Sequence, residues 1–141
     1  MPPTTEFVDP VSAARSALAS VIEQDRPAVD ALVGRWVPQI SAKRDGTEWE
    51  GLTYDLPRIL SLHEGFAFDD GALLVDGAEY NFMLNGSPMV GWYISIVDVP
   101  FADPQGALDW CVAFDFDADN CAAKLITNDQ AITPTFVTQD P

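Results

Sequence analysis

The sequence predicts an α+β domain because it repeats a strand, helix and strand pattern. Each copy has a Trp-led apolar strand, a helix with Pro in its first turn and a second apolar strand, and the copies cover residues 36–75 and 92–126. Two βαβ units in tandem predict a ferredoxin-like βαββαβ antiparallel sheet with both helices on one face. We therefore expect the other face of the sheet to be free to bind a ligand.

A helical segment is expected before this domain, at residues 11–34. Apolar residues on one stripe predict a helix over 11–24, and Pro27 and Gly34 mark the start and the end of a second, short helix. Residues 1–10 and 128–141 are rich in Pro and Thr and are predicted to be flexible tails or linkers. We interpret residues 35–127 as the βαββαβ domain, excised from a longer protein.

The first βαβ unit begins with the strand at residues 36–41. A polar loop is expected at 43–53, in which Trp49 and Leu52 pack against the core. A helix is predicted over 56–64, because Asp55 or Thr53 can cap its start and Gly65 can end it.

The second βαβ unit is joined to the first by a predicted hairpin. The strand pattern of residues 72–82, with a bulge at Gly77, is followed by the turn signal Asn85-Gly86 and then by the strand at 92–97. A helix follows from Asp103 to about residue 114, then a turn at 115–120 and the last strand at 122–126. The buried residues expected in this helix are Ala107, Leu108, Cys111 and Val112.

The charge of the chain argues against two classes of partner. It has 22 acidic and 7 basic residues, a formal net charge of −15, so its mean field repels phosphate backbones and anionic lipid. No segment reaches the roughly 18 apolar residues of a membrane span. We expect neither nucleic-acid binding nor membrane insertion.

Strand alternation assigns candidate ligand-binding residues to the open face. If the helices cover the face that carries Ile94 and Ile96, the opposite face presents polar and aromatic side chains. Aromatic rings, amides and hydroxyls together suit a sugar polymer. The alternative is that these are ordinary solvent-facing sheet residues. The predicted ligand-binding residues are Gln39, Ser41, Tyr93 and Ser95, with Tyr80 and Asn81 added from the hairpin.

The two cysteines allow either a disulfide or two buried thiols. Cys111 lies in the last predicted helix and Cys121 at the start of the last strand, and a helix and strand of one βαβ unit pack face to face. An oxidised pair would place the domain outside the cytoplasm. Free, buried cysteines are the alternative.

No residue set in the sequence predicts catalysis, a metal site or a cofactor. His63 is the only histidine and is expected to be structural, so the chain lacks a base for a nucleophile. The run at residues 115–120 alternates carboxylates like a calcium-binding loop, but it lacks the Gly and the final Glu of that motif. We expect a turn there, with a weak Ca²⁺ site as the alternative.

The order of several short motifs resembles the SPOR domain of bacterial cell-envelope proteins, and most closely an actinobacterial, acidic, extracytoplasmic module of that kind. The motifs are Trp36-Val37-Pro38-Gln39, Thr53-Tyr54-Asp55, Pro100-Phe101, Trp110-Cys111 and Cys121-Ala122-Ala123-Lys124-Leu125. The resemblance covers roughly residues 34–127. It implies a module of the cell envelope that binds peptidoglycan glycan strands without stem peptides across the exposed sheet face.

Two function classes follow from the sequence. The first is a non-catalytic module that binds a cell-wall glycan through hydrogen bonds and stacking. The second is an extracytoplasmic protein-interaction or sensor domain of a larger membrane protein, which uses the sheet face or the exposed aromatics Trp49 and Trp92. The sequence does not predict an oligomeric state.

Overall fold

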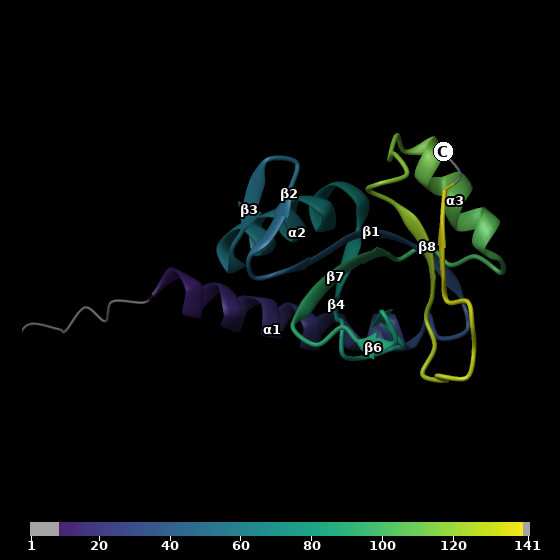
Figure 1. The fold of residues 1–141 in the computed structure, drawn as a ribbon, viewed down its shortest axis with the longest axis horizontal. Helices are drawn as coiled ribbons and strands as arrows, with labels where there is room; N and C mark the ends of the chain where they lie inside the picture. Colours follow the sequence, from purple (N-terminus) through teal and green to yellow (C-terminus); the bar gives the residue numbers. More distant parts are fainter. Residues whose placement is uncertain (1–8, 140–141) are drawn as a thin grey trace, which may run out of the picture.

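The computed structural model describes residues 9–139, which form an α+β fold with helices packed on a five-stranded antiparallel sheet (Figure 1). The helices are α1 (Pro10–Asp30), α2 (Leu56–Asp70) and α3 (Pro104–Ala113). The sheet has the order β4 (Ala72–Asp76), β7 (Trp92–Val97), β1 (Trp36–Arg44), β8 (Ala122–Leu125) and β9 (Phe136–Thr138). Two separate hairpins pair β2 (Thr47–Trp49) with β3 (Leu52–Tyr54) and β5 (Met83–Leu84) with β6 (Ser87–Pro88).

Helices α2 and α3 begin in the same way, as their sequences predict. Asp55 accepts a hydrogen bond from the Arg58 N–H at 3.0 Å, and Asp103 accepts one from the Gly106 N–H at 2.9 Å. Each Asp is an N-cap and a Pro lies in the following turn, where its missing N–H costs nothing. These local signals fix both helix starts.

The predicted end of α2 at Gly65 is wrong. The helix continues for another turn and a half, to Asp70, and ends where Gly71 adopts a left-handed φ of 65°. Glycine within a helix costs only about 1 kcal/mol relative to alanine, and packing of Phe66 against Phe116 favours the longer helix. A single Gly was therefore too weak a stop signal.

The N-terminal segment is one helix, and the predicted break at Pro27 is also wrong. Pro27 lies inside α1, while Val29 lies beyond it and is buried in the core. Arg26 donates two hydrogen bonds to Glu79, at 2.8 and 2.7 Å, which tie this part of the helix to the segment after β4. These tertiary contacts offset the hydrogen bond that proline removes.

Helix α1 runs along β4, the edge strand of the sheet (Figure 1). The Asp25 side chain accepts a hydrogen bond from the backbone N–H of Leu74 at 2.8 Å. This N–H lies on the outer edge of β4, where no neighbouring strand in the described residues offers a carbonyl to accept its hydrogen bond. The helix therefore covers an edge that would otherwise be open to pairing with another chain.

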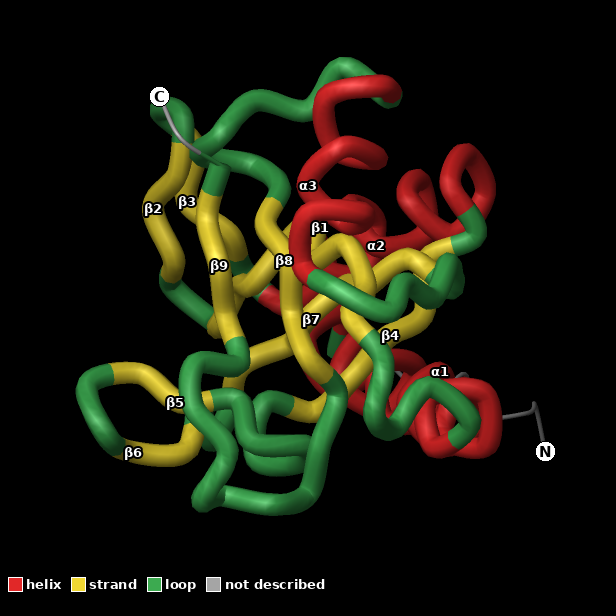
Figure 2. The backbone as a smooth tube through the Cα atoms, turned by 90° about the vertical axis from the view of Figure 1, so that its right-hand side faces the viewer, coloured by secondary structure: helices red, strands yellow, loops and turns green. Residues whose placement is uncertain are grey.

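The assignment of sheet faces from the sequence is wrong. Helix α2 lies against the face that carries Leu74 and Ser95, whereas Ile94 and Ile96 face the opposite way. The isoleucine face is filled by the end of α1 and by residues 77–91, through a cluster that includes Val29, Leu32, Tyr80 and Phe82. Figure 2 shows the helices on one side and the two short hairpins on the other.

The predicted hairpin of the second and third strands is present but has an inserted segment. Strand β4 ends at Asp76 and pairs with β7, and Asn85-Gly86 turns only the short β5–β6 hairpin between them. Gly77 donates its N–H to the Trp92 carbonyl at 2.9 Å, and a Cβ on Gly77 would lie 2.3 Å from the Met89 carbonyl oxygen. Its role is close backbone approach and not the predicted bulge.

Two segments that the sequence assigns to loop or tail contain strands. The expected loop at 43–53 holds the end of β1 and the β2–β3 hairpin, in which Trp49 is half-buried but Leu52 is exposed. Strand β9 lies in the expected flexible C-terminal tail and pairs with β8. The expected N-terminal tail lies outside the described residues except for Asp9 and Pro10, which cap and begin α1.

The disulfide alternative for the two cysteines is confirmed. Cys111 and Cys121 form a bond whose Cα atoms are 5.8 Å apart, which ties α3 to the start of β8. Ala107 and Cys111 are buried in α3 as predicted, Leu108 is half-buried, and Val112 is exposed. None of the helices within residues 9–139 is long and apolar enough to cross a membrane.

Candidate ligand-binding groove

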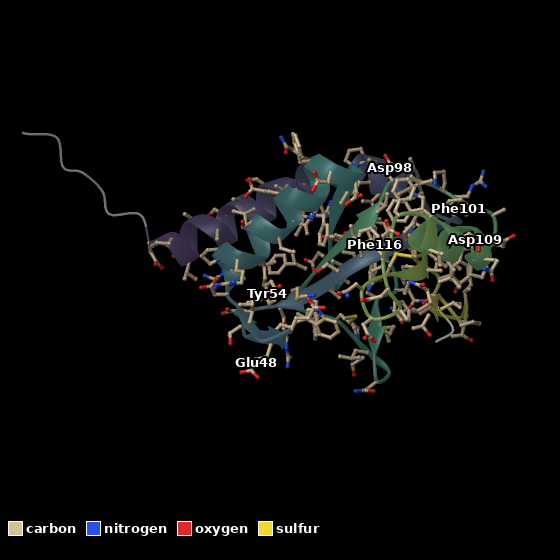
Figure 3. All side chains as sticks on the ribbon, turned by 90° about the horizontal axis from the view of Figure 1, so that it is seen from above. Glu48, Tyr54, Asp98, Phe101, Asp109 and Phe116 are labelled. Carbon is tan, nitrogen blue, oxygen red and sulfur yellow. A yellow bond between two sulfur atoms is a disulfide. The ribbon has the colours of Figure 1, made fainter. Side chains whose placement is uncertain are left out.

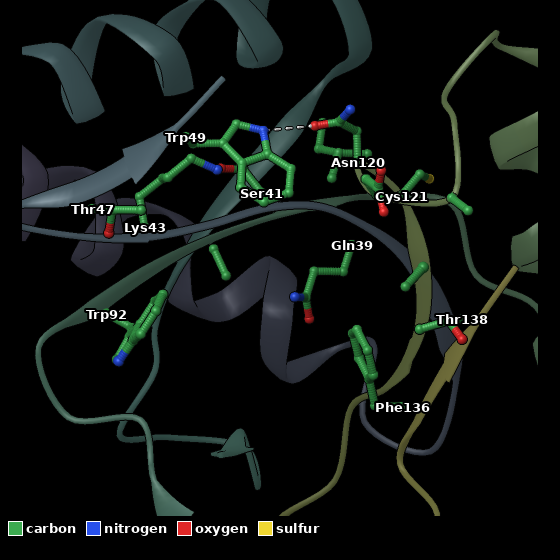
Figure 4. A pocket seen from close by; sticks show the side chains of 15 residues that line it. Gln39, Ser41, Lys43, Thr47, Trp49, Trp92, Asn120, Cys121, Phe136 and Thr138 are labelled. Atoms are coloured by element: carbon green, nitrogen blue, oxygen red, sulfur yellow. Dashed lines mark hydrogen bonds between the residues drawn. The ribbon is translucent and has the colours of Figure 1, made fainter. Parts of the chain in front are cut away.

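A groove of about 410 Å³ lies along β1 beside Ala122, the first residue of β8 (Figure 4). Strand β1 pairs with β8 only over residues 36–39, although it continues to Arg44. Beyond Gln39, the groove opens along β1 between the β2–β3 hairpin and the turn before β8. Its aromatic lining residues are Trp49, Trp92 and Phe136, and its polar ones include Gln39, Ser41, Lys43, Thr47, Asn120 and Thr138.

A β-bulge shapes the groove. The register of β1 against β7 shifts between Gln39 and Ser41, which pair with Ile96 and Ser95. This shift interrupts the alternation of side chains, so residues on both sides of the bulge line one groove. Strict alternation in the sequence analysis missed this irregularity.

Gln39 offers an unused hydrogen-bond acceptor in the groove. Its Oε1 atom is buried and has no hydrogen-bond partner among residues 9–139. Figure 4 shows the side chain between Trp92 and Phe136. A buried amide oxygen without a partner costs about 1–3 kcal/mol, and a rotation of this side chain into the groove would let an N–H or O–H donor on a ligand recover that energy.

Trp49 is held in place from across the groove. Its Nε1–H donates to Asn120 Oδ1 at 3.2 Å, the contact drawn in Figure 4, and Asn120 Nδ2 donates to Asp117 at 2.8 Å. Gln139 donates from Nε2 to the carbonyls of Asp117 and Cys121, each at 3.0 Å. The hairpin and the turn before β8 therefore form two connected walls.

The groove has little net charge although the chain is strongly acidic. Its charged lining residues are Lys43 and Asp119. The Lys43 ammonium lies 5.3 Å from the centre of the Trp49 ring and 5.5 Å from that of Tyr54. Burial lowers the pKa of Lys43, and the nearby Glu50 opposes that shift. A ligand that places at most one negative charge inside the groove suits such a lining.

Two of the predicted site residues, Gln39 and Ser41, lie in the groove, whereas Tyr93 and Ser95 do not. Ser95 is 3% exposed, and its Oγ lies 2.7 Å from Nδ1 of His63 in a hydrogen bond. Tyr93 packs against the cluster between α1 and α2. The prediction that both line an open face is wrong, because α2 covers that face.

Tyr80 and Asn81 lie outside the groove as well. Tyr80 is buried, and its hydroxyl donates to Asp30 on α1. Burial, supported by Asp30, raises the pKa of Tyr80. The Asn81 carbonyl accepts a hydrogen bond from Lys124 Nζ at 2.7 Å. Both residues join segment 77–91 to the core and do not face a ligand.

The sequence analysis missed several groove residues for different reasons. Asn120 was treated only as part of a turn, and Phe136 as part of a flexible tail. Lys43 was placed in a polar loop. Phe136 reaches the groove through the pairing of β9 with β8, Asn120 through the turn before β8, and Lys43 because β1 continues to Arg44; no local pattern in the sequence encodes the first two contacts.

The other candidate chemical groups have structural surroundings. His63 is buried beneath the sheet, and burial lowers its pKa. The run at residues 115–120 folds as a turn, in which Asp117 accepts the Asp119 N–H at 3.1 Å. In the part of the chain that the structure describes, no three His, Cys, Asp or Glu side chains are placed to hold a metal ion.

Comparison with protein-family models, curated proteins and solved structures finds no match to this chain.

Proposed function

We propose that this chain is a non-catalytic module that binds a glycan in the groove along β1. The observation that carries the proposal is the unpartnered Gln39 Oε1 in a groove with three aromatic side chains. Aromatic rings pack against the apolar C–H surface of sugars, while amides and hydroxyls bond sugar hydroxyl and N-acyl groups. The glycan is a peptidoglycan strand of a bacterial cell wall.

The order of the strands supports a ferredoxin-like, SPOR-like fold, and the envelope assignment rests on the resemblance to SPOR domains. Strands β1, β4, β7 and β8 follow one another in the chain with α2 and α3 inserted, and they lie in the order β4-β7-β1-β8. This is the order expected of a βαββαβ unit. The Pro100-Phe101 corner is held next to β1 by two hydrogen bonds between Phe101 and Trp36, at 2.9 and 2.8 Å.

The structure also bears on where a glycan would contact the chain. Residues 77–91 and the end of α1 fill much of the sheet face opposite α2 and α3. The proposed contact is therefore the groove over β1 and not the whole face. The disulfide is consistent with an extracytoplasmic location, because such bonds persist mainly in oxidising compartments.

Co-sedimentation with isolated peptidoglycan tests this function. The oxidised chain is mixed with peptidoglycan before and after an amidase removes the stem peptides, at low and high salt. We expect binding that rises after amidase treatment, persists in high salt and falls several-fold in Gln39→Ala and Phe136→Ala. Phe68→Ala is the control, because Phe68 is fully on the surface and outside the groove. No binding to either preparation, or equal loss in the control, contradicts the proposal.

A second surface favours an envelope protein as an alternative partner. The rings of Phe66, Phe116, Trp110 and Phe114 follow one another with centroids 6.3, 5.7 and 4.4 Å apart, and Phe114 is exposed. Figure 3 shows Phe116, Asp109, Phe101 and Asp98 at the same end of the molecule. Residues 98–119, to which these labelled residues belong, carry six Asp and no Lys or Arg, so this surface is mainly acidic.

A basic, partly apolar protein segment would fit that surface. Its binding would weaken as salt screens the charges and would be lost in Phe114→Ser, whereas Gln39→Ala would have no effect. Binding that is insensitive to both salt and Phe114→Ser would exclude this surface as the contact.

A further inference from the structure

The Lys43 ammonium lies in the groove with hydrogen-bonding capacity to spare. The residue is 8% exposed, and within residues 9–139 the one hydrogen bond of its ammonium is to Ser41 Oγ, at the long distance of 3.3 Å. An ammonium group has three donors. Figure 4 shows the side chain extending beside Trp49 toward Ser41, at the wall of the groove.

Lys124, the other buried lysine, shows what a structural ammonium looks like in this chain. Its Nζ donates to the Asn81 carbonyl at 2.7 Å and to Thr135 Oγ1 at 2.8 Å, and it lies outside the groove lining. Both bonds are short and join separate segments. Lys43 has neither of these features, so its contacts within the chain do not account for its buried charge.

No acidic side chain among residues 9–139 lies within 4 Å of the Lys43 ammonium, and Glu50 acts on its charge only from a longer distance. The ion pairs of residues 9–139 are those of Arg26 with Glu23 and Glu79. A buried cation without an anion is costly, and in a chain with 22 acids a partner would be easy to supply. Lys124 has no anionic partner in the described residues either, but two short hydrogen bonds hold its ammonium, so it is the unused donors of Lys43, together with its missing ion pair, that point to a ligand.

We propose that Lys43 and Ser41 form a carboxylate subsite, so the glycan that the groove binds carries free carboxylate groups. This inference rests on the proposed glycan function. Ser41 Oγ accepts a hydrogen bond from the Lys43 ammonium and keeps its own O–H to donate, so both side chains offer donors to one carboxylate. Trp49 and Tyr54 pack beside the ammonium and exclude water, which strengthens a charge-assisted hydrogen bond.

A single carboxylate fits this subsite better than a phosphate or sulfate ester. Lys43 is the one cation that lines the groove in the described residues, and Asp119 lies on the same lining. No arginine offers the two-pronged geometry that phosphate groups favour. Gln39 lies roughly 13 Å along β1 from Lys43, at about 3.3 Å per residue, so the two side chains would contact different parts of an extended glycan.

The test compares three soluble probes by titration calorimetry. The first is amidase-treated peptidoglycan strands with free carboxylates, the second is the same strands with the carboxylates reduced to alcohols, and the third is an oligomer of N-acetylglucosamine. We expect the wild-type chain to bind the first at least tenfold more tightly than the second and the third. Because this comparison changes only the ligand, it does not depend on whether a variant folds.

Variants then assign the preference to the subsite. Lys43→Met and Ser41→Ala should lower the affinity for the carboxylate strands to that for the reduced strands, and leave binding of the reduced strands unchanged. Arg58→Gln is the control, because Arg58 is an exposed cation on α2 and does not line the groove. Equal affinity of the wild type for carboxylate and reduced strands overturns the subsite but leaves the glycan function standing. Failure to bind any probe overturns both.

Discussion

Reduction of the disulfide should destabilise the fold by an amount that follows from its position. The bond joins residues ten apart, and closing a loop of about ten residues in the unfolded chain contributes about 2.7 kcal/mol at 25 °C in the chain-entropy estimate. Since Cys111 and Cys121 are both buried, the reduced thiols would stay in the core without a new cavity.

Urea unfolding of the oxidised and the thiol-reduced chain, followed by far-UV circular dichroism, measures this difference. Reduction is a better perturbation than Cys111→Ala with Cys121→Ala, because the double variant adds the loss of buried sulfur to the loss of the cross-link. Val112→Ala is a control for substitution in α3, and it should change stability little because Val112 is exposed to solvent on the same helix.

Reduction of the disulfide should also affect the groove. Cys121 follows Asn120, whose side chain holds Trp49 across the groove. Reduction should therefore weaken glycan binding as well as stability, while the carbonyl contacts of Gln139 keep part of the turn in place. A loss of unfolding free energy below about 1 kcal/mol on reduction would contradict the explanation that the disulfide stabilises the fold by closing a loop in the unfolded chain.

Two further predictions concern buried polar groups. Burial lowers the pKa of Lys124 from 10.5 to about 8. Between pH 8 and pH 10.5 the unfolded chain therefore binds more protons than the folded chain, and the stability of the fold rises with pH. Below pH 8 the folded chain bears the full cost of burying the charge. Relative to Lys124→Met, the wild type should gain about 2 kcal/mol in unfolding free energy between pH 7 and pH 9.5, as measured by urea titration at the two pH values. No gain would show that Lys124 is not buried as a cation. Asp25→Ala removes the acceptor of the Leu74 N–H and should cost about 1–3 kcal/mol, with a smaller loss in Asp25→Asn, which keeps an acceptor. Equal stability of all three chains at Asp25 would mean that water or another group satisfies the edge of β4.

The parts of the fold that the sequence predicts are those with local signals. Asp55 and Asp103 cap their helices through their own neighbours three residues on, and the following Pro residues mark the same starts. The contact of Cys111 with Cys121 follows from the packing of a helix on its own strand. None of these needs information from distant parts of the chain.

The parts that the sequence misplaces depend on tertiary contacts. Pro27 reads as a helix start, yet the contacts of Arg26 and Val29 keep α1 continuous through it. Whether the sheet face that carries Ser95 is open depends on where α2 packs. The bulge after Gln39 interrupts the regular alternation of side chains in β1, on which the sequence-based assignment of faces depended.

The sequence predicts only part of the groove, because some of its residues depend on tertiary contacts. Gln39 and Ser41 are in the groove because they lie at the bulge on the central strand β1. Phe136 and Asn120 reach it through strand pairing and a turn that link residues about 80 or more positions away from Gln39 in the chain. A pattern read along the sequence carries no signal for such contacts.

The central claim, that the groove along β1 binds the glycan, is tested most directly by mapping the contact in solution. The ¹⁵N-labelled, oxidised chain is titrated with amidase-treated peptidoglycan strands and followed by NMR. We expect the largest shifts at the Gln39 side-chain amide, the Trp49 indole N–H and the Asn120 side chain, with Phe114 unchanged. Shifts confined to α3 and Phe114, or none at saturating glycan, would contradict it.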